Sequence, residues 1–116
     1  MKKLLLVDDD RLFIEEFANY LRKRGFIAHT VPDGTDVLYH IRDDWFDYMI
    51  TDLNMPFMGG IELIEFLKEH KIFKPEKIIV FSGEISGSDR KKLLNLGVIH
   101  IIDKQDYNDV VKVINS

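Results

Sequence analysis

Short apolar runs alternate with amphipathic segments along the whole chain. The first run, Leu4–Val7, is continuously apolar, as is typical of a strand that is covered on both faces. Four further runs rich in apolar residues also predict strands: Phe26–Val31, Tyr48–Asp52, Ile78–Ser82 and Val98–Asp103. The pattern therefore predicts five strands, each separated from the next by a longer segment.

The segments between these strands carry apolar residues at helical spacing. We expect Asp10 to cap the first helix and Thr35 to cap the second, while Gly25 and Gly97 end the first and fourth helices. Residues 108–114 predict a fifth helix. The apolar positions of the first four helices are Ile14, Phe17, Ala18 and Leu21; Val37, Leu38 and Ile41; Ile61, Ile64 and Leu67; and Leu93, Leu94 and Leu96.

Strands that alternate with helices predict an α/β fold, in which a parallel sheet carries helices on both faces. We expect a (βα)5 doubly wound, five-stranded sheet in the flavodoxin-like order 2-1-3-4-5, as one domain over residues 1–116. Sites in such folds lie beyond the carboxyl ends of the strands, where the strand order reverses. In this order the reversal falls between the first and third strands.

Carboxylates follow the two strands that flank this switch point. Asp8, Asp9 and Asp10 come directly after the first strand, and Asp52 ends the third. Carboxylates beside apolar strands cost free energy unless a charge compensates them, and several in one pocket repel each other. Hard oxygen ligands suit Mg²⁺ or Ca²⁺. The sequence therefore predicts a divalent-cation site at this edge of the sheet.

A hydroxyl and an ammonium group are expected at the same edge. Ser82 ends the fourth strand, and Lys104 follows the fifth. Beside a carboxylate–metal cluster such donors suggest a bound phosphoryl group, because stabilising its charge needs a divalent cation and oriented donors. Asp52 lies between the acid pair and the two donors, so it is the best-placed nucleophile for forming an acyl phosphate.

The composition argues against several other functions. The net charge of −4 gives no support for direct nucleic-acid binding, which needs a basic face. The absence of cysteine excludes disulfides and thiolate metal sites. The N-terminal apolar run is too short for a signal peptide or a membrane span. We therefore expect a cytoplasmic protein that does not associate with membranes.

The same residues resemble the response-regulator receiver domains, the family of the chemotaxis regulator CheY. Leu6-Val7-Asp8-Asp9-Asp10 resembles the family's acidic pair, and residues 52–60 resemble its phosphoacceptor loop. The separations of these acids from Ser82 and Lys104 along the chain also match the family. The resemblance covers essentially the whole chain and implies a role in bacterial two-component or phosphorelay signalling.

This resemblance implies that Asp52 accepts a phosphoryl group from a phosphohistidine of a sensor histidine kinase or a histidine phosphotransfer protein. Asp9 and Asp52 would ligate Mg²⁺ directly with the backbone carbonyl of Asn54, and Asp8 would act mostly through water. The chain would be no enzyme beyond its own phosphorylation and dephosphorylation. Phosphorylation would switch its interaction with an output protein or an attached output domain, and residues 1–116 contain no output domain.

The resemblance also assigns the other site residues. Ser82 would bond a phosphoryl oxygen in the active state, and Lys104 would pair with the phosphate. Asn54 and Glu84 occupy two variable positions that tune dephosphorylation by controlling the attacking water. Ile101 stands where the family usually has a Tyr or Phe that turns inward, so the usual aromatic readout of phosphorylation is missing.

A second departure from the family pattern follows the lysine. The family normally has a proline there, often after a cis bond, whereas Gln105 follows Lys104 in this chain. A cis bond without proline costs about 3 kcal/mol. We therefore predict a trans bond and an altered last loop.

Two other interpretations compete with a phosphorylated switch. A degenerate module would bind partners without phosphorylation, and Ile101 leaves some room for it. A phosphatase acting through an aspartyl phosphate is disfavoured, because residues 52–54 supply no second acid. Leu12 and Phe13 are candidates for either the core or a phosphodonor docking site, and residues 55–58 either pack locally or contact a partner. The sequence leaves homodimer formation through the last two helices and the fifth strand open.

Overall fold

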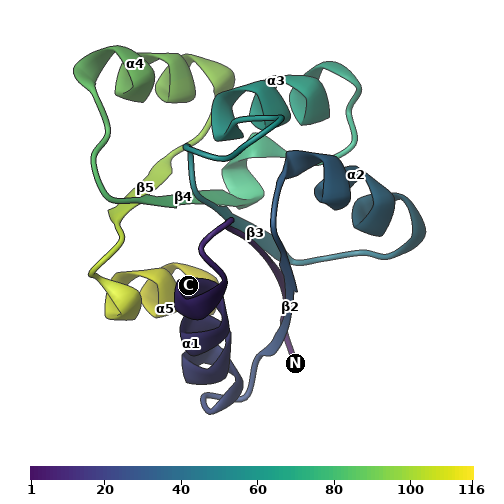
Figure 1. Ribbon diagram of the computed structural model, residues 1–116, viewed down its shortest axis with the longest axis vertical. Helices are drawn as coiled ribbons and strands as arrows, with labels where there is room; N and C mark the ends of the chain where they lie inside the picture. Colours follow the sequence, from purple (N-terminus) through teal and green to yellow (C-terminus); the bar gives the residue numbers. More distant parts are fainter.

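Five parallel strands alternate with five α-helices along the chain (Figure 1). The computed structural model describes all residues from 1 to 116. Its strands are β1 (Lys3–Val7), β2 (Ile27–Val31), β3 (Tyr48–Thr51), β4 (Ile78–Ser82) and β5 (His100–Asp103). Its helices are α1 (Arg11–Arg22), α2 (Gly34–Asp43), α3 (Gly60–Glu69), α4 (Gly87–Leu96) and α5 (Tyr107–Asn115), with a 3₁₀ turn at Pro75–Lys77. None of these helices has the length and apolar character needed to cross a membrane.

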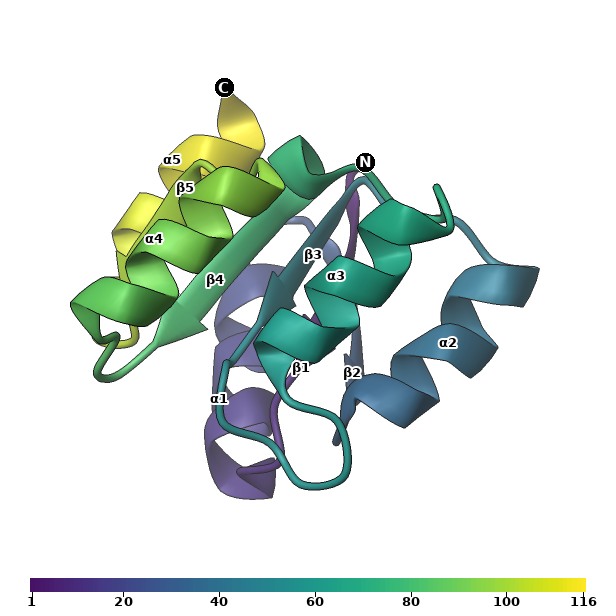
Figure 2. The same cartoon turned by 90° about the horizontal axis from the view of Figure 1, so that it is seen from above.

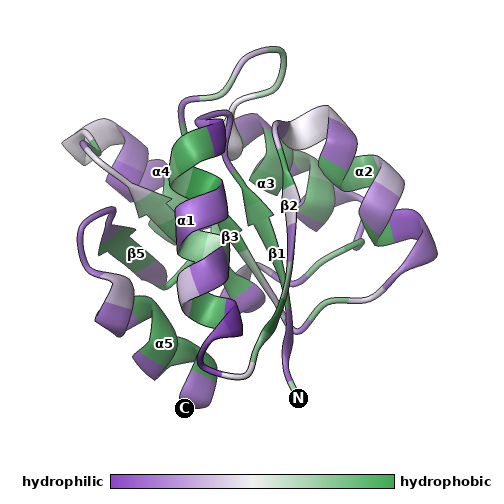
Figure 3. Cartoon of the chain, turned by 60° about the horizontal axis from the view of Figure 1, so that its bottom comes forward, coloured by the Kyte–Doolittle hydropathy of each residue, from purple (hydrophilic) through white to green (hydrophobic).

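The strands form one sheet in the order β2-β1-β3-β4-β5, which confirms the predicted topology. Helices α1 and α5 cover one face, and α2, α3 and α4 cover the other (Figures 1 and 2). Successive side chains of a strand point to opposite faces. Leu4 and Leu6 therefore enter the core under α1 and α5, while Leu5 and Val7 enter the other core. Both faces of β1 are buried, which is why this strand is apolar after its first residue (Figure 3).

Aspartates cap both N-terminal helices of the chain. Asp10 caps α1 as predicted, because its Oδ1 accepts a hydrogen bond from the Phe13 N–H at 3.1 Å. The predicted cap of α2 was wrong: Asp33, not Thr35, is the capping residue. The Asp33 Oδ1 accepts the N–H groups of Thr35 and Asp36 at 2.9 and 3.1 Å. Thr35 lies inside the helix, and its hydroxyl donates to Asp33 instead.

The structure also differs from three predictions about α3, α4 and β5. In α3 the fully buried positions include Leu63, while Ile61 is only half-buried at the edge of the apolar stripe. Leu93 is the only buried residue of α4, and Leu94 turns outward with 55% of its surface exposed. Strand β5 begins two residues later than predicted, so Val98 is buried in the connection before the strand.

The first residue of α3 lies directly against the end of β3. The Gly60 N–H donates to the Leu53 carbonyl at 2.9 Å. A Cβ atom on Gly60 would lie 2.5 Å from the backbone oxygen of Asp52, closer than real contacts allow. Only glycine permits this approach, which fixes the start of α3 beside Asp52.

Candidate functional site

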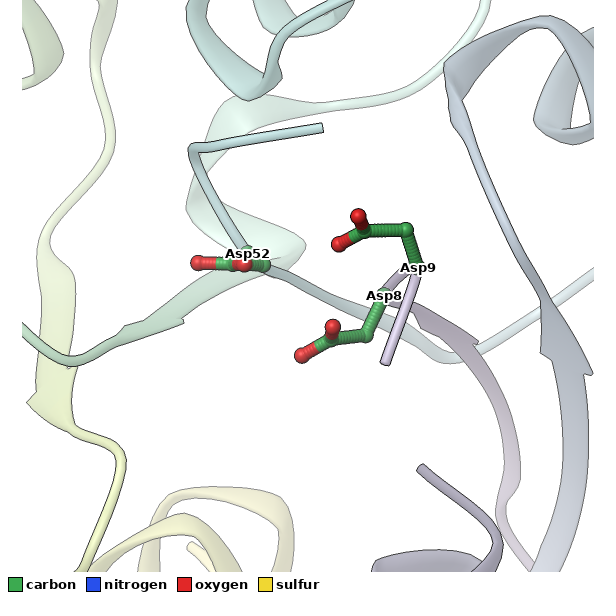
Figure 4. A group of neighbouring side chains, drawn as sticks. All are labelled: Asp8, Asp9 and Asp52. Carbon is green, nitrogen blue, oxygen red and sulfur yellow. The ribbon is translucent and has the colours of Figure 1, made fainter. Parts of the chain in front are cut away.

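The acidic site lies where the ends of β1 and β3 meet. Val7 and Thr51 are paired in the sheet, so the residues that follow them leave the sheet side by side. The Asp52 N–H donates to the Val7 carbonyl at 3.0 Å, which holds the two ends together. Carboxylate oxygens of Asp8, Asp9 and Asp52 lie within 4.8 Å of one another. Figure 4 shows Asp8 and Asp9 extending from β1 towards the side on which Asp52 lies.

Asp52 is buried, and its two carboxylate oxygens have different surroundings. Oδ1 accepts hydrogen bonds from the Ser82 hydroxyl at 2.7 Å and from the Leu53 N–H at 2.8 Å. Oδ2 lies 3.5 Å from the Lys104 ammonium. Two donors therefore orient the carboxylate through one oxygen, and the other oxygen is left facing a single cation.

Lys104 reaches the acids from the end of β5. Its Nζ lies 2.7 Å from Oδ2 of Asp8, which is almost fully buried. The Lys104 N–H donates to the Ser82 carbonyl at 3.1 Å, so the loop after β5 is fixed against the end of β4. The predicted carboxylates, hydroxyl and lysine thus come from four neighbouring strands and meet at one edge of the sheet.

Burial and charge pull the pKa values of this pair in opposite directions. Burial raises the pKa of Asp8, although the Lys104 ammonium and the Asp10 N–H partly offset that effect by stabilising the carboxylate. For Lys104 burial is the largest single influence and favours the neutral amine. The hydrogen bonds and charges of Asp8 and Asp52 together outweigh it, so the pKa of Lys104 is raised and the ammonium form is retained.

The donor set fits a hard divalent cation. Asp8, Asp9 and Asp52 can each offer one carboxylate oxygen, and one ammonium group opposes their three charges. Asp9 is exposed, and its side chain makes no hydrogen bond or ion pair, so it is free to bind a ligand. Carboxylate oxygens at such separations are the ligands that Mg²⁺ and Ca²⁺ prefer.

The remaining predicted residues lie around this cluster. Asn54 is exposed two residues after Asp52, and its backbone carbonyl accepts no hydrogen bond. Glu84 is exposed beyond the end of β4 and contacts none of the acids by a hydrogen bond or ion pair. Ile101 is half-buried and packs into the core under α2, α3 and α4. The peptide bond between Lys104 and Gln105 is trans, which confirms the prediction.

One contact of the site was not predicted from the sequence. The Lys104 ammonium lies 4.5 Å from the centre of the Phe13 ring. Phe13 is half-buried and joins the core under α1 and α5, whereas its neighbour Leu12 is 86% exposed. The sequence left Phe13 outside the clearest apolar stripe of the first helix, and no local pattern relates it to a lysine that follows β5.

Known proteins resemble this chain over almost its full length. A family model described as the response regulator receiver domain matches residues 4–115. The photosynthetic apparatus regulatory protein RegA of Rhodobacter capsulatus is 30% identical over 97% of this chain and 61% of its own length. The probable transcriptional regulator ycf29 of Pyropia yezoensis is 29% identical over 98% of this chain and 52% of its own. A solved CheY-like receiver domain from Methanospirillum hungatei JF-1 has a TM-score of 0.88 at 28% identity, covering 99% of this chain and 91% of that chain.

The fold and the site define a doubly wound α/β domain with an acidic cluster at its switch point. This chain belongs to the response regulator receiver domain family, whose members are signalling domains of two-component systems and not classical enzymes. It spans only part of the length of these curated relatives, 52% of ycf29 and 61% of RegA.

Proposed function

We propose that Asp52 accepts a phosphoryl group from a phosphohistidine of a histidine kinase or phosphotransfer protein, and that the acyl phosphate switches binding to an output partner. The observation that carries this proposal is the convergence of Ser82, Lys104 and two further acids on one buried aspartate. An aspartate with a purely structural role would not need two neighbouring carboxylates, because they only add repulsion. The same convergence argues against a module that works without phosphorylation.

The transfer uses the less occupied oxygen of the carboxylate. Oδ2 of Asp52 attacks phosphorus, and an O–P bond forms while the P–N bond to the donor imidazole breaks. The electron pair of that bond leaves with the imidazole nitrogen. Lys104 supplies positive charge beside the attacking oxygen, at 3.5 Å, where phosphoryl oxygens arrive. The Ser82 and Leu53 donors hold the carboxylate by Oδ1 during the attack.

A Mg²⁺ ion would be held by Asp9 and Asp52 with the Asn54 carbonyl, and by Asp8 mostly through water. When bound, it would neutralise the charge that the carboxylates and phosphoryl oxygens bring together. The unpaired state of Asp9 and the free Asn54 carbonyl support this assignment.

After transfer, Ser82 has a new partner available. Its hydroxyl donates to Oδ1 of Asp52 in this structure, and rotation about its side chain would turn it to a phosphoryl oxygen. Lys104 would remain paired with the phosphoryl group. Asn54 and Glu84 are both exposed near the ends of β3 and β4, where they can influence the water that hydrolyses the acyl phosphate.

Two exposed apolar side chains support a protein phosphodonor. Leu12 lies in the first turn of α1, three residues after Asp9, and Phe57 lies in the loop after Asp52 with 90% of its surface exposed. Met55 and Met58 of the same loop pack against the core, so Phe57 is its outward-facing residue. Apolar surface beside a polar site is typical of a docking surface.

The test is the formation of a covalent adduct. Incubation with Mg²⁺ and acetyl phosphate should add the mass of one phosphoryl group to the intact protein, and Asp52→Asn should abolish that adduct. Asp103→Asn is a matched control, because Asp103 also ends a strand at this edge but lies outside the cluster. No adduct on the wild type, or an equal adduct on Asp52→Asn, would overturn the proposal.

A further inference from the structure

Lys104 contacts an aromatic cluster as well as the acids. The Phe13 ring that faces its ammonium lies 6.0 Å from Phe17, 6.0 Å from Phe81 and 6.1 Å from Tyr107, measured between ring centres. Phe17 in turn lies 4.8 Å from both Phe81 and Tyr107. Such separations are typical of interacting aromatic pairs. A continuous path of rings therefore starts at the lysine of the site.

This path leads to the interface between α1 and α5. Tyr107 is the first residue of α5 and lies 5.0 Å from Tyr20 of α1 in an edge-to-face arrangement. The Tyr20 hydroxyl donates to Oδ1 of Asn108 at 2.5 Å. The first turn of α5 is thus held to α1 by rings and by a hydrogen bond, three residues after Lys104. Figure 1 shows the two helices side by side.

No comparable aromatic path leads to α4. Ile101, which lies in β5 three residues before Lys104, packs into the opposite core. The chain therefore has rings beside Lys104 on the α1–α5 face and an isoleucine on the α4 face. A displacement of Lys104 changes the surroundings of Phe13 directly, whereas Ile101 has no ring to reorient.

We infer that Phe13 is a positioning residue that couples Lys104 to the α1–α5 interface, so that phosphorylation is read at the first turns of α1 and α5 instead of at α4. This inference rests on the proposed phosphorylation of Asp52. In the unmodified protein Lys104 is shared by Asp8, Asp52 and the Phe13 ring. Acyl phosphate formation replaces the single carboxylate charge of Asp52 with the roughly two negative charges of a phosphoryl group. The site therefore gains about one negative charge, which draws the ammonium from Asp8 and from the ring.

The physical consequence is a change in packing at the start of α5. A ring that faces a cation is attracted to it, so withdrawal of the cation removes one of the interactions that orient Phe13. Phe13 then repacks against Tyr107, and the first turn of α5 shifts relative to α1. Two arrangements that differ by one such contact differ in population by about twofold to fivefold, which is enough to shift the balance between two conformations.

The test compares amide hydrogen exchange before and after phosphorylation with acetyl phosphate and Mg²⁺. In the wild type we expect exchange in the first turns of α1 and α5 to change by about twofold or more, with a smaller change in α4. Phe13→Leu keeps an apolar side chain and removes the ring, so the response of α5 should be lost. Phe13→Tyr restores the ring and should restore the response, which a merely structural role for residue 13 would not require.

Phe66→Leu is the matched control. Phe66 is a half-buried aromatic residue of α3 that stacks on His70, outside the path from Lys104. Its loss should leave the response of α5 intact. Tyr20→Phe gives a second test if Phe13→Leu fails to fold, because it retains the ring but removes the bond to Asn108, and should weaken the response.

The intact mass of each sample separates this inference from the proposed function. An α5 response in Phe13→Leu equal to that of the wild type, at equal phosphate content, would overturn the inference and leave the proposed function standing. A response confined to α4 and β5 would do the same. Absence of the phosphate adduct on the wild type would overturn the proposed function, and the coupling with it.

Discussion

Lys104 is the only cation in contact with the acidic site. Its ammonium pairs closely with Asp8 and more distantly with Asp52, and Asp9 has no ion pair. One positive charge therefore opposes three negative charges within a few ångströms. Folding brings the three acids together, so their uncompensated repulsion should lower the free energy of unfolding of the metal-free protein.

Asp9→Asn removes one of these charges with almost no change in shape. We expect the free energy of unfolding in EDTA to rise by up to about 1 kcal/mol, the usual size of an interaction between accessible charges. Urea denaturation measures it. Asp10→Asn is the matched control, since asparagine caps a helix as well as aspartate does and Asp10 is not part of the cluster. If the two variants are equally stable, the cluster carries no special repulsion.

At the scale of elements, the helices around the site are positioned by contacts in their first turns. Asp33 starts α2 by accepting two N–H groups and the Thr35 hydroxyl. Gly60 starts α3 by touching the backbone of Asp52 and Leu53. Both contacts are local in structure, but only the first is also local in sequence.

Asp33→Ala should lower the free energy of unfolding at neutral pH by about 1 kcal/mol, the usual value of an N-cap. Hydrogen bonding from Thr35, and to a lesser extent from the two backbone N–H groups, lowers the pKa of Asp33 in the folded state. A lowered folded pKa gives stability that is present above the unfolded pKa and lost as the pH falls through the folded pKa. The difference between wild type and variant should therefore shrink in acid. Denaturation at a series of pH values tests it, and a constant difference would contradict the assignment of the cap.

Gly60→Ala should destabilise the protein by about 1–3 kcal/mol, because the new methyl group collides with the backbone of β3 and the loop after it. Since that backbone carries Asp52, the rate of adduct formation should fall as well. Gly87→Ala is the control: it also lies at the start of a helix, but its Cβ would meet nothing within 4 Å. Equal effects of the two substitutions on stability would rule out the collision.

For the whole molecule, metal binding and folding are linked. Asp9 follows β1 and Asp52 follows β3, so their carboxylates share a site only when the sheet has formed. A cation that binds this site stabilises the folded state alone. The same is true of any ligand that needs both strands.

Mg²⁺ at ten times its dissociation constant should therefore raise the free energy of unfolding by about 1.4 kcal/mol, and EDTA should reverse the gain. Urea denaturation across a Mg²⁺ titration measures the effect. Asp9→Asn should lose most of it, whereas Asp10→Asn should keep it. A stability that is independent of Mg²⁺ in the wild type would contradict a metal site made by these acids.

The sequence was sufficient for the topology and for most of the cluster. Strand ends lie at one edge of a parallel sheet, so strand order alone predicts that Asp8, Asp9 and Asp52 meet. The cap of α2 was missed because Asp33 and Thr35 are both good capping residues, and the choice depends on where the strand before them ends. The sequence also placed Ile61 in the buried stripe of α3 and left out Leu63. Both residues are apolar, and only the orientation of the helix on the sheet decides which of them is buried.

Contacts between distant elements could not be predicted in this way. Phe13 and Lys104 meet because α1 and the loop after β5 cross the same end of the sheet, and neither local sequence encodes that meeting. Helix α1 carries the rings of Phe13, Phe17 and Tyr20, and α5 carries that of Tyr107; in the sequence pattern these rings are indistinguishable from ordinary core residues. Their connection to the site depends on side-chain distances, which a pattern of apolar positions does not contain.

Helix α5 has one more property that follows from its two ends. It starts beside Lys104, and its last turn is held by the Lys2 ammonium, which donates to the Ile114 carbonyl at 2.5 Å. Nine residues of helix span about 13 Å. The helix therefore moves as one rigid unit, and the hydrogen bond from Lys2 restrains its C-terminal turn. A tilt that begins at the first turn would strain this hydrogen bond, and the strength of the Lys2 contact would therefore limit how far α5 can tilt.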